Sequence, residues 1–230
     1  MKWEVPKIWK GGECWIIGGG PSIVQQFGIP SNVVEGVRVG DLPTSVYSPY
    51  LSVLHDKHVV GVNTSFMLGN WVDMLFFGDN KFYLHFEQQV NDFPNLKVTC
   101  SSNANSRSGN NKHIKYLSRS SKSRGLTKNR GQVCWNVNSG AAAINVALHT
   151  GVKRVILLGF DMKLDSKQRQ HWHDYYTKKG QVRRKLPFDR HLIGFDDIKK
   201  DADRFGLEII NANPDSALNH FPKVNVKELL

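Results

Sequence analysis

The sequence predicts an α/β fold of the Rossmann-like class, with a mainly parallel sheet, helices on both faces and two basic loop insertions. Short apolar runs alternate with helix-like segments along the 230 residues, a length that fits one nucleotide-binding α/β domain over 1–230. The run at 155–161 is continuously apolar, as is typical of a central parallel strand covered on both faces. Several such runs end in glycine or small polar residues, where open α/β sheets bind their ligands.

The first strand is expected from Glu13 to Ile17 and leads into a glycine-rich loop. Glycines let the backbone approach a ligand closely, and the start of a following helix points free N–H groups at an anion. The loop has neither the Gly-x-Gly-x-x-Gly pattern nor the lysine of a P-loop, and such a cluster also occurs as a plain turn. As a nucleotide site it would consist of Gly18, Gly19, Gly20, Pro21 and Ser22, with Pro21 in the first helical turn and Ser22 as a cap or hydroxyl donor.

Polar residues also follow the next two expected strands, at 58–63 and 71–77. Glycines and prolines interrupt the preceding stretch, 22–58, so a short helix and then an irregular connection are expected there. Asn63, Asp79 and Asn80 would meet the glycine loop at one sheet edge and contact a nucleotide. The alternative is that Asn63 and Asp79 only cap the helices that follow. A helix at 83–90 and a strand at 96–100 complete the first half.

The segment 101–131 is rich in Ser, Asn, Gly, Lys and Arg and poor in large apolar residues. It cannot bury enough surface to fold alone, so it is interpreted as a basic flexible insertion or lid.

The second half has the clearest alternation of strand and helix. A short strand at 132–135 precedes an alanine-rich helix at 138–149, with Ser139 and Gly140 at its start and Gly151 just past its end. The central strand follows and ends at Asp161. A second basic insertion, at 162–193, is assigned to catalysis or to the acceptor side, and a helix at 195–205, a strand at 207–211 and a turn into a short helix at 214–218 follow.

The chain is strongly basic, with a formal net charge of +11 and a pI near 9.6, so an anionic substrate or partner is considered.

The three cysteines lack metal-ligand spacing and lie in apolar runs, which favours buried thiols in a reducing compartment. No apolar stretch approaches the length of a membrane span, and a cytoplasmic protein is expected. The sequence does not indicate an oligomeric state, and a homo-oligomer is compatible with it.

The order of these motifs resembles bacterial sialyltransferases that use CMP-sialic acid, in a superfamily that also includes flagellin-modifying glycosyltransferases and a 6-hydroxymethylpterin diphosphokinase. Their Gly-Asn-Gly-Pro-Ser loop matches residues 18–22 except that Gly19 replaces the asparagine. Their strand-end asparagines match Asn63 and Asn80, or less directly Asp79. Their Thr-Ser-Gly helix start and following strand look like 138–140 and 155–161, and their Pro-Asn-Ser-Leu-Leu resembles 214–218. The resemblance implies an inverting enzyme with no tightly bound cofactor and a nucleotide-sugar donor, preferably a CMP-sugar.

The resemblance also indicates catalytic candidates. His191 takes the place of the histidine that precedes the penultimate helix, so it is the first candidate for the general base. His171 and His173 form a rival pair that an extended chain would point the same way, either for acid–base chemistry or, with Asp161 or Asp174, for a metal. The resembling enzymes work without metal, and no metal is assigned. Contacts to the leaving phosphate or the acceptor are expected from Tyr175, Tyr176, Arg183 and Arg184. The alternative for the two tyrosines is that they only pack against the core.

These observations predict a nucleotide-sugar-dependent, sialyltransferase-like glycosyltransferase that acts on a glycan, protein or nucleic-acid acceptor. Two alternatives stay open. An ATP-dependent diphosphokinase would use the same frame, with Mg²⁺ held by carboxylates such as Asp79 and Asp161. A non-catalytic nucleotide or nucleic-acid binding module would act through the basic insertions alone.

Overall fold

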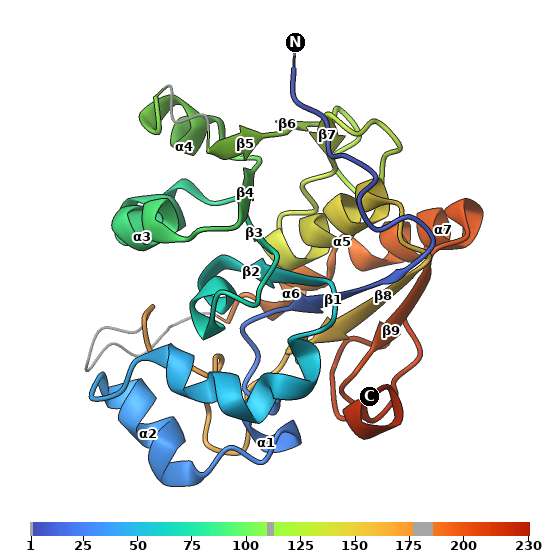
Figure 1. Ribbon diagram of the computed structural model, residues 1–230. Helices are drawn as coiled ribbons and strands as arrows, with labels where there is room; N and C mark the ends of the chain where they lie inside the picture. The colour runs from blue at the N-terminus through green and yellow to red at the C-terminus, as the bar shows by residue number, and fades with distance from the viewer. Residues whose placement is uncertain (1, 110–112, 177–185) are drawn as a thin grey trace.

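The computed structural model describes residues 2–109, 113–176 and 186–230. A seven-stranded, fully parallel sheet runs through it in the order β5-β4-β3-β2-β1-β8-β9, and β6 and β7 form a separate two-stranded sheet (Figure 1). This architecture confirms the predicted Rossmann-like α/β class. The strands are β1 (Glu13–Ile17), β2 (Val59–Val62), β3 (Met74–Phe77), β4 (Leu96–Thr99), β5 (Ile114–Tyr116), β6 (Ser118–Arg119), β7 (Gln132–Val133), β8 (Arg154–Leu158) and β9 (Glu208–Asn211).

Helices cover both faces of the large sheet, as expected (Figure 1). The α-helices are α1 (Ser22–Gln26), α2 (Ser31–Val39), α3 (Asn80–Asp92), α4 (Ser102–Arg107), α5 (Ser139–Thr150), α6 (Phe188–Leu192) and α7 (Phe195–Phe205). Three 3₁₀ helices are η1 (Thr44–Leu54), η2 (Asn63–Leu68) and η3 (Val226–Glu228). None of the helices in the described ranges is long and apolar enough to cross a bilayer.

Alternate side chains of each strand enter two different cores. In β1, Cys14 and Ile16 pack with the small residues of α5 and with α7, whereas Trp15 and Ile17 pack with α1, α2 and η1. This period of two is the geometry of an extended strand. The alanines of α5 are fully buried and let the helix lie close to the sheet, which brings its N-terminus to the carboxyl ends of the strands.

The strand order reverses beside β1. From β1 the chain adds β2, β3, β4 and β5 on one side, and it then crosses back through α5 to place β8 on the other side of β1. The carboxyl ends of β1 and β8 therefore border a topological switch point, the usual ligand position in an open parallel sheet.

The stretch between the glycine loop and β2 is more regular than expected. It contains α1, α2 and the eleven-residue η1 instead of one short helix and an irregular connection. Two of the expected breakers stand at the ends of α2, where they are compatible with helix: Pro30 precedes it, and Gly40 ends it in a left-handed conformation. Two others, Gly36 and Pro49, lie inside α2 and η1 themselves.

The predicted short helix at 214–218 is wrong. That segment is a turn, in which Oδ1 of Asn213 accepts a hydrogen bond from the Asp215 N–H and Oγ of Ser216 accepts one from the Leu218 N–H, while the Ser216 hydroxyl donates to Phe160 O.

The basic segment 101–131 contains α4, β5 and β6, and β5 forms the edge strand of the large sheet. Its few apolar side chains, Leu117 and Leu126 among them, are buried in the core beside α5. Asp201 of α7 holds it from the other side: its buried carboxylate accepts hydrogen bonds from the Leu126 N–H at 2.7 Å and from Lys122. Composition alone could not reveal these long-range contacts.

Replacing Asp201 with asparagine should lower the free energy of unfolding by about 2 kcal/mol at pH 7, because charge-assisted hydrogen bonds to the 122–126 segment weaken. Burial alone would raise the pKa of Asp201, but the hydrogen bonds from Leu126 and Lys122 outweigh it and hold the pKa below its ordinary value. The stabilisation is therefore present above the ordinary carboxyl pKa and is lost as the pH falls through the lowered one. Urea unfolding across pH checks this; a difference between wild type and Asp201→Asn that grows toward low pH would contradict it.

Candidate functional site

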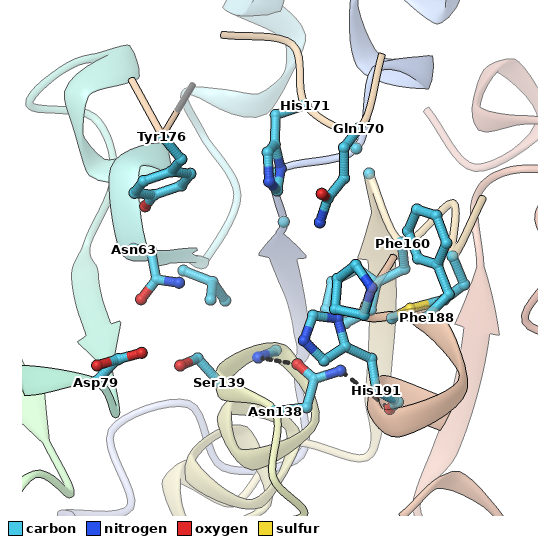
Figure 2. Close-up of a pocket in the computed structure, with 18 of the residues that line it drawn as sticks. Asn63, Asp79, Asn138, Ser139, Phe160, Gln170, His171, Tyr176, Phe188 and His191 are labelled. Carbon is cyan, nitrogen blue, oxygen red and sulfur yellow. Dashed lines mark hydrogen bonds between the residues drawn. The ribbon is translucent and has the colours of Figure 1, made fainter. Parts of the chain in front are cut away.

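A pocket of about 740 Å³ lies at the carboxyl ends of β1, β2, β3 and β8, at the switch point of the sheet (Figure 2). This volume is in the range of small-molecule sites. Figure 2 shows Asn63, Asp79 and Tyr176 on one side of it, with Phe160, Phe188 and His191 on the other. Twelve of the predicted site residues line this pocket: Gly18, Gly19, Gly20, Asn63, Asp79, Ser139, Gly140, Asp161, His171, Tyr175, Tyr176 and His191.

Each glycine of the first loop faces an atom that leaves no room for a side chain. A Cβ on Gly18 would lie 2.8 Å from the carbonyl oxygen of Gly159, and one on Gly20 would lie 2.6 Å from the carboxyl carbon of Asp161. A Cβ on Gly19 would lie 2.7 Å from Nδ1 of His171. The glycines thus let the loop pack against the end of β8 and against the segment that carries His171, in addition to leaving its backbone open to the pocket.

Hydrogen bonds between Ser22 and Asp161 connect the glycine loop after β1 with the loop after β8 at the switch point. The Ser22 N–H donates to Oδ2 of Asp161 at 2.8 Å, and its hydroxyl donates to Oδ1, which also accepts from the Asn213 side chain at 2.8 Å. Burial raises the pKa of Asp161, although these hydrogen bonds oppose the shift. Ser22 therefore does not cap α1 and, like Pro21, is absent from the pocket lining. Asp161 stands at the pocket wall with its oxygens already engaged.

Asn63 presents an unsatisfied buried oxygen at the end of β2. Its backbone adopts the left-handed conformation, with a φ of 52°, which asparagine tolerates better than most residues. Its Oδ1 is buried and accepts no hydrogen bond from the described part of the chain, and the side chain lies at the pocket (Figure 2). A buried acceptor without a donor is costly, so a ligand donor would satisfy it.

The N-terminus of α5 forms the floor of the pocket as drawn in Figure 2. Asn138 caps it, since its Oδ1 accepts hydrogen bonds from the N–H groups of Gly140 at 2.8 Å and Ala141 at 3.3 Å. Its amide also donates to the carbonyl of His191 at 3.2 Å, which ties α6 to α5. Ser139 and Gly140 line the pocket beside it. Asn138 was not among the predicted site residues, although its position before a Ser-Gly-Ala run is a recognisable N-cap signal.

His171 lines the pocket, whereas His173 lies behind its wall. Their rings are stacked, 5.2 Å apart and 1° from parallel, which agrees with the expected shared direction. His173 is buried; its Nδ1 accepts from the Tyr175 N–H at 3.3 Å and its Nε2 lies 2.7 Å from the Thr64 hydroxyl. Because Nδ1 accepts, the neutral ring carries its hydrogen on Nε2 and donates to Thr64. Through these two contacts His173 can hold the pocket-lining segment that carries His171 and Tyr175 in place.

The segment that carries these residues is fastened to the glycine loop and to α2. The backbone N–H of Trp172 donates to Gly19 O at 3.0 Å, and its indole donates to Gly18 O at 3.2 Å. Arg38 of α2 donates to His171 O at 2.7 Å and forms an ion pair with Asp174. Tyr175 and Tyr176 continue from this segment into the pocket lining, and burial raises the pKa of Tyr175. Its hydroxyl therefore stays protonated at neutral pH and can donate a hydrogen bond.

The remaining predicted residues fall elsewhere. Asn80 lies outside the main pocket, in a second one considered below, and Asp79 borders both. Arg183 and Arg184 lie outside the described residues. Among the described residues, positive charge on the main pocket wall comes from Lys81, Lys163 and Arg190. Other lining residues that sequence reasoning missed include the aromatic Trp135, Phe160 and Phe188 and the amide of Gln170, which carried no motif signal.

The described side chains around the main pocket do not form an evident metal site. No group of three or more histidine, cysteine or acidic side chains in the described ranges is close enough to hold a metal ion. Asp161 uses its oxygens for Ser22 and Asn213, and Asp174 pairs with Arg38. The carboxylates named for Mg²⁺ under the diphosphokinase alternative therefore do not fit that role as a pair, because Asp161 has little capacity left to coordinate a cation.

Comparison with known proteins finds that the fold of this chain is similar to several solved structures. No family model and no curated protein matches the sequence. Among solved structures, the MAf glycosyltransferase from Magnetospirillum magneticum AMB-1 is 12% identical with a TM-score of 0.58; the match covers all of this chain and 36% of that protein. The sialyltransferase CstII from Campylobacter jejuni, in complex with the substrate analogue cytidine-5'-monophosphate, is 12% identical with a TM-score of 0.50, covering 94% of this chain and 85% of CstII.

The monofunctional α-2,3-sialyltransferase Cst-I from the same organism is 14% identical with a TM-score of 0.50, and the match covers 93% of this chain and 80% of Cst-I. These likenesses confirm the resemblance in fold that the order of motifs suggested. The chain has the fold of these glycosyltransferases.

Proposed function

We propose that the chain is a nucleotide-sugar-dependent glycosyltransferase that binds its donor, preferably a CMP-sugar, in the main pocket. The observation that carries the proposal is the buried, unpartnered Oδ1 of Asn63 at the switch point of the sheet. A nucleotide would satisfy that oxygen, because it offers sugar hydroxyls and, in cytidine, an exocyclic amino group as donors. The fold of CstII, which was solved with cytidine-5'-monophosphate, supports the choice of nucleotide.

Several groups suit the phosphate of such a donor. Ser139 and the N-terminal end of α5 offer a hydroxyl and the positive end of a helix dipole, although Asn138 already uses two of the helix N–H groups. Tyr175 and Tyr176 line the pocket with phenol groups, and Lys163 and Arg190 add positive charge. Such donors stabilise negative charge as it develops on the leaving phosphate.

His191 is the proposed general base. It lines the pocket from α6 and lies beside Asn138, whose side-chain amide donates a hydrogen bond to its backbone carbonyl (Figure 2). In the reaction, the oxygen of the acceptor hydroxyl forms a bond to the anomeric carbon while the bond from that carbon to the phosphate oxygen breaks. The hydroxyl proton passes to the imidazole, and the nucleoside monophosphate leaves with the bonding electron pair. His171 lies next to the glycine loop and is assigned a phosphate contact, with His173 as its positioning neighbour.

A nucleotide panel tests the proposal. Thermal unfolding is followed with CMP, UMP, GMP and ATP, each with and without Mg²⁺, because a ligand that binds only the folded state raises the melting temperature. The expected result is the largest increase with CMP, independent of Mg²⁺. An increase that appears only with ATP and Mg²⁺ would support the diphosphokinase alternative, and no increase with any nucleotide would contradict a nucleotide site. Steeply salt-dependent binding of DNA in place of nucleotide would favour the non-catalytic module.

Gly19 provides a local test of the glycine loop. Gly19→Ala should weaken CMP binding by about tenfold, because its methyl group would lie 2.7 Å from Nδ1 of His171, too close for two non-bonded atoms, and so would displace the imidazole from the pocket wall. Gly12→Ala is the matched control, since its Cβ would lie 3.4 Å from the nearest atom, the Trp9 carbonyl, far from the pocket. Calorimetric titration of both variants checks the prediction; equal CMP affinity in the two variants would refute it.

A further inference from the structure

A second pocket, of about 540 Å³, adjoins the first along the same edge of the sheet. It lies at the carboxyl ends of β3, β4 and β5, and it shares Asp79 and Trp135 with the main pocket. An acceptor bound there would lie directly beside a donor in the main pocket.

The walls of this second pocket are mainly polar. Apart from Trp135 and the thiol of Cys100, its side chains carry hydroxyl, amide or charged groups. These come from the loop after β3, the start of α4, the end of β5 and β6: Asp79, Asn80, Ser101, Ser102, Asn103, Tyr116, Ser118 and Arg119. Such a lining matches a ligand with many hydroxyl groups, and Trp135 offers the aromatic surface on which the C–H face of a sugar ring can pack.

Asn80 gives an independent sign of a missing ligand. Its Oδ1 is buried and accepts no hydrogen bond from the residues that the structure describes. The residue lines the second pocket and not the first. A ligand hydroxyl in the second pocket would satisfy this oxygen in the same way that a nucleotide would satisfy Asn63 in the first.

Arg119 provides a fixed cation. Its Nη2 donates to Gly78 O at 2.8 Å and its Nε to Cys100 O at 3.1 Å, so the guanidinium bridges the ends of β3 and β4. The guanidinium carbon also lies 4.1 Å from the ring centroid of Trp135. These contacts use two of the five N–H groups of the side chain and leave others for a ligand anion.

We infer that the second pocket binds the acceptor, and that this acceptor is a carbohydrate with an anionic group, a carboxylate or a phosphate, held by Arg119. The inference rests on the proposed function. Asp79, on the wall shared with the main pocket, repels the anionic group and so orients it toward Arg119. The reactive hydroxyl then lies at the end nearest the donor.

The test measures sugar binding and CMP binding separately by calorimetric titration of the full chain. The probes are methyl β-D-glucoside, methyl β-D-glucuronide and glucose 6-phosphate, each with CMP present. The two acidic sugars should bind at least about tenfold more tightly than the neutral one, and the tighter of the two identifies carboxylate or phosphate as the preferred anion. Arg119→Gln should remove the preference, and Arg107→Gln on the exposed face of α4 should retain it.

Two further variants separate binding from folding. Asn103→Trp fills the second pocket from exposed residue 103 and should abolish binding of all three sugars, whereas Ser106→Trp adds the same bulk on α4 outside the pocket and should not. Equal affinity for acidic and neutral sugars, no sugar binding at all, or binding that survives Asn103→Trp would overturn the inference even if CMP binds. In another outcome, the protein binds no CMP and yet binds sugars in a way that Asn103→Trp abolishes. That result would support the second pocket as a sugar site and contradict the proposed function.

Discussion

His191→Ala should lower kcat for sugar transfer by about 10²- to 10⁴-fold, the usual contribution of a general base. The residue lines the main pocket, and the hydrogen bond from Asn138 goes to its backbone carbonyl. The substitution should therefore remove the proposed proton acceptor and leave the proposed nucleotide contact at Asn63 in place. Release of CMP from a CMP-sugar in the presence of an acceptor measures kcat. The Kd of CMP should change little, since the lost interaction belongs to the transition state.

His113→Ala is the control for this prediction, because His113 is exposed and lines neither pocket. A kcat for His191→Ala equal to that of His113→Ala would contradict the assignment of the base. If His171→Ala then caused the large loss instead, the base would lie on the wall segment that carries His171.

Asp161→Ala should lower the free energy of unfolding by about 3 kcal/mol, because it removes the acceptor of hydrogen bonds from both groups of Ser22 and from Asn213. It should also weaken CMP binding, since the glycine loop loses its attachment to the end of β8. Urea unfolding and CMP titration measure the two effects.

Asp215→Ala is the matched control, because Asp215 is exposed and close in sequence to the partner Asn213. Its unfolding free energy should stay within about 0.5 kcal/mol of wild type. An Asp161→Ala variant as stable as Asp215→Ala would show that the Ser22–Asp161 contact does not hold the loops together.

The position of the main pocket could be predicted from the sequence because it depends on a general rule. Polar residues that follow parallel strands gather at one sheet edge, and Asn63, Asp79 and Asp161 do line one pocket. The role of Asp161 could not be predicted in the same way. Its partner Ser22 lies 139 residues away in sequence, and no local pattern reports such a contact.

The glycine loop, too, could be predicted only in part from the sequence. Its place after β1 follows from the apolar run and the glycines, but the reason for three glycines depends on neighbours from distant segments, such as His171 at Gly19. The segment 101–131 has so few apolar residues that its composition predicts a flexible insertion. Leu117, Leu126 and the contact of Asp201 with Leu126 suffice to connect it with the rest of the structure, and only the tertiary structure shows this.

Calorimetric titration of CMP into wild type and Asn63→Gly tests the nucleotide site most directly. Glycine keeps the left-handed backbone at position 63 and removes only the side chain. Gln168→Gly is the control, because Gln168 is another left-handed residue and does not line the pocket. Wild type and Gln168→Gly should bind CMP with a Kd between about 1 μM and 1 mM, and Asn63→Gly about tenfold more weakly. No saturable binding of CMP to wild type, or equal affinity in Asn63→Gly, would contradict the account.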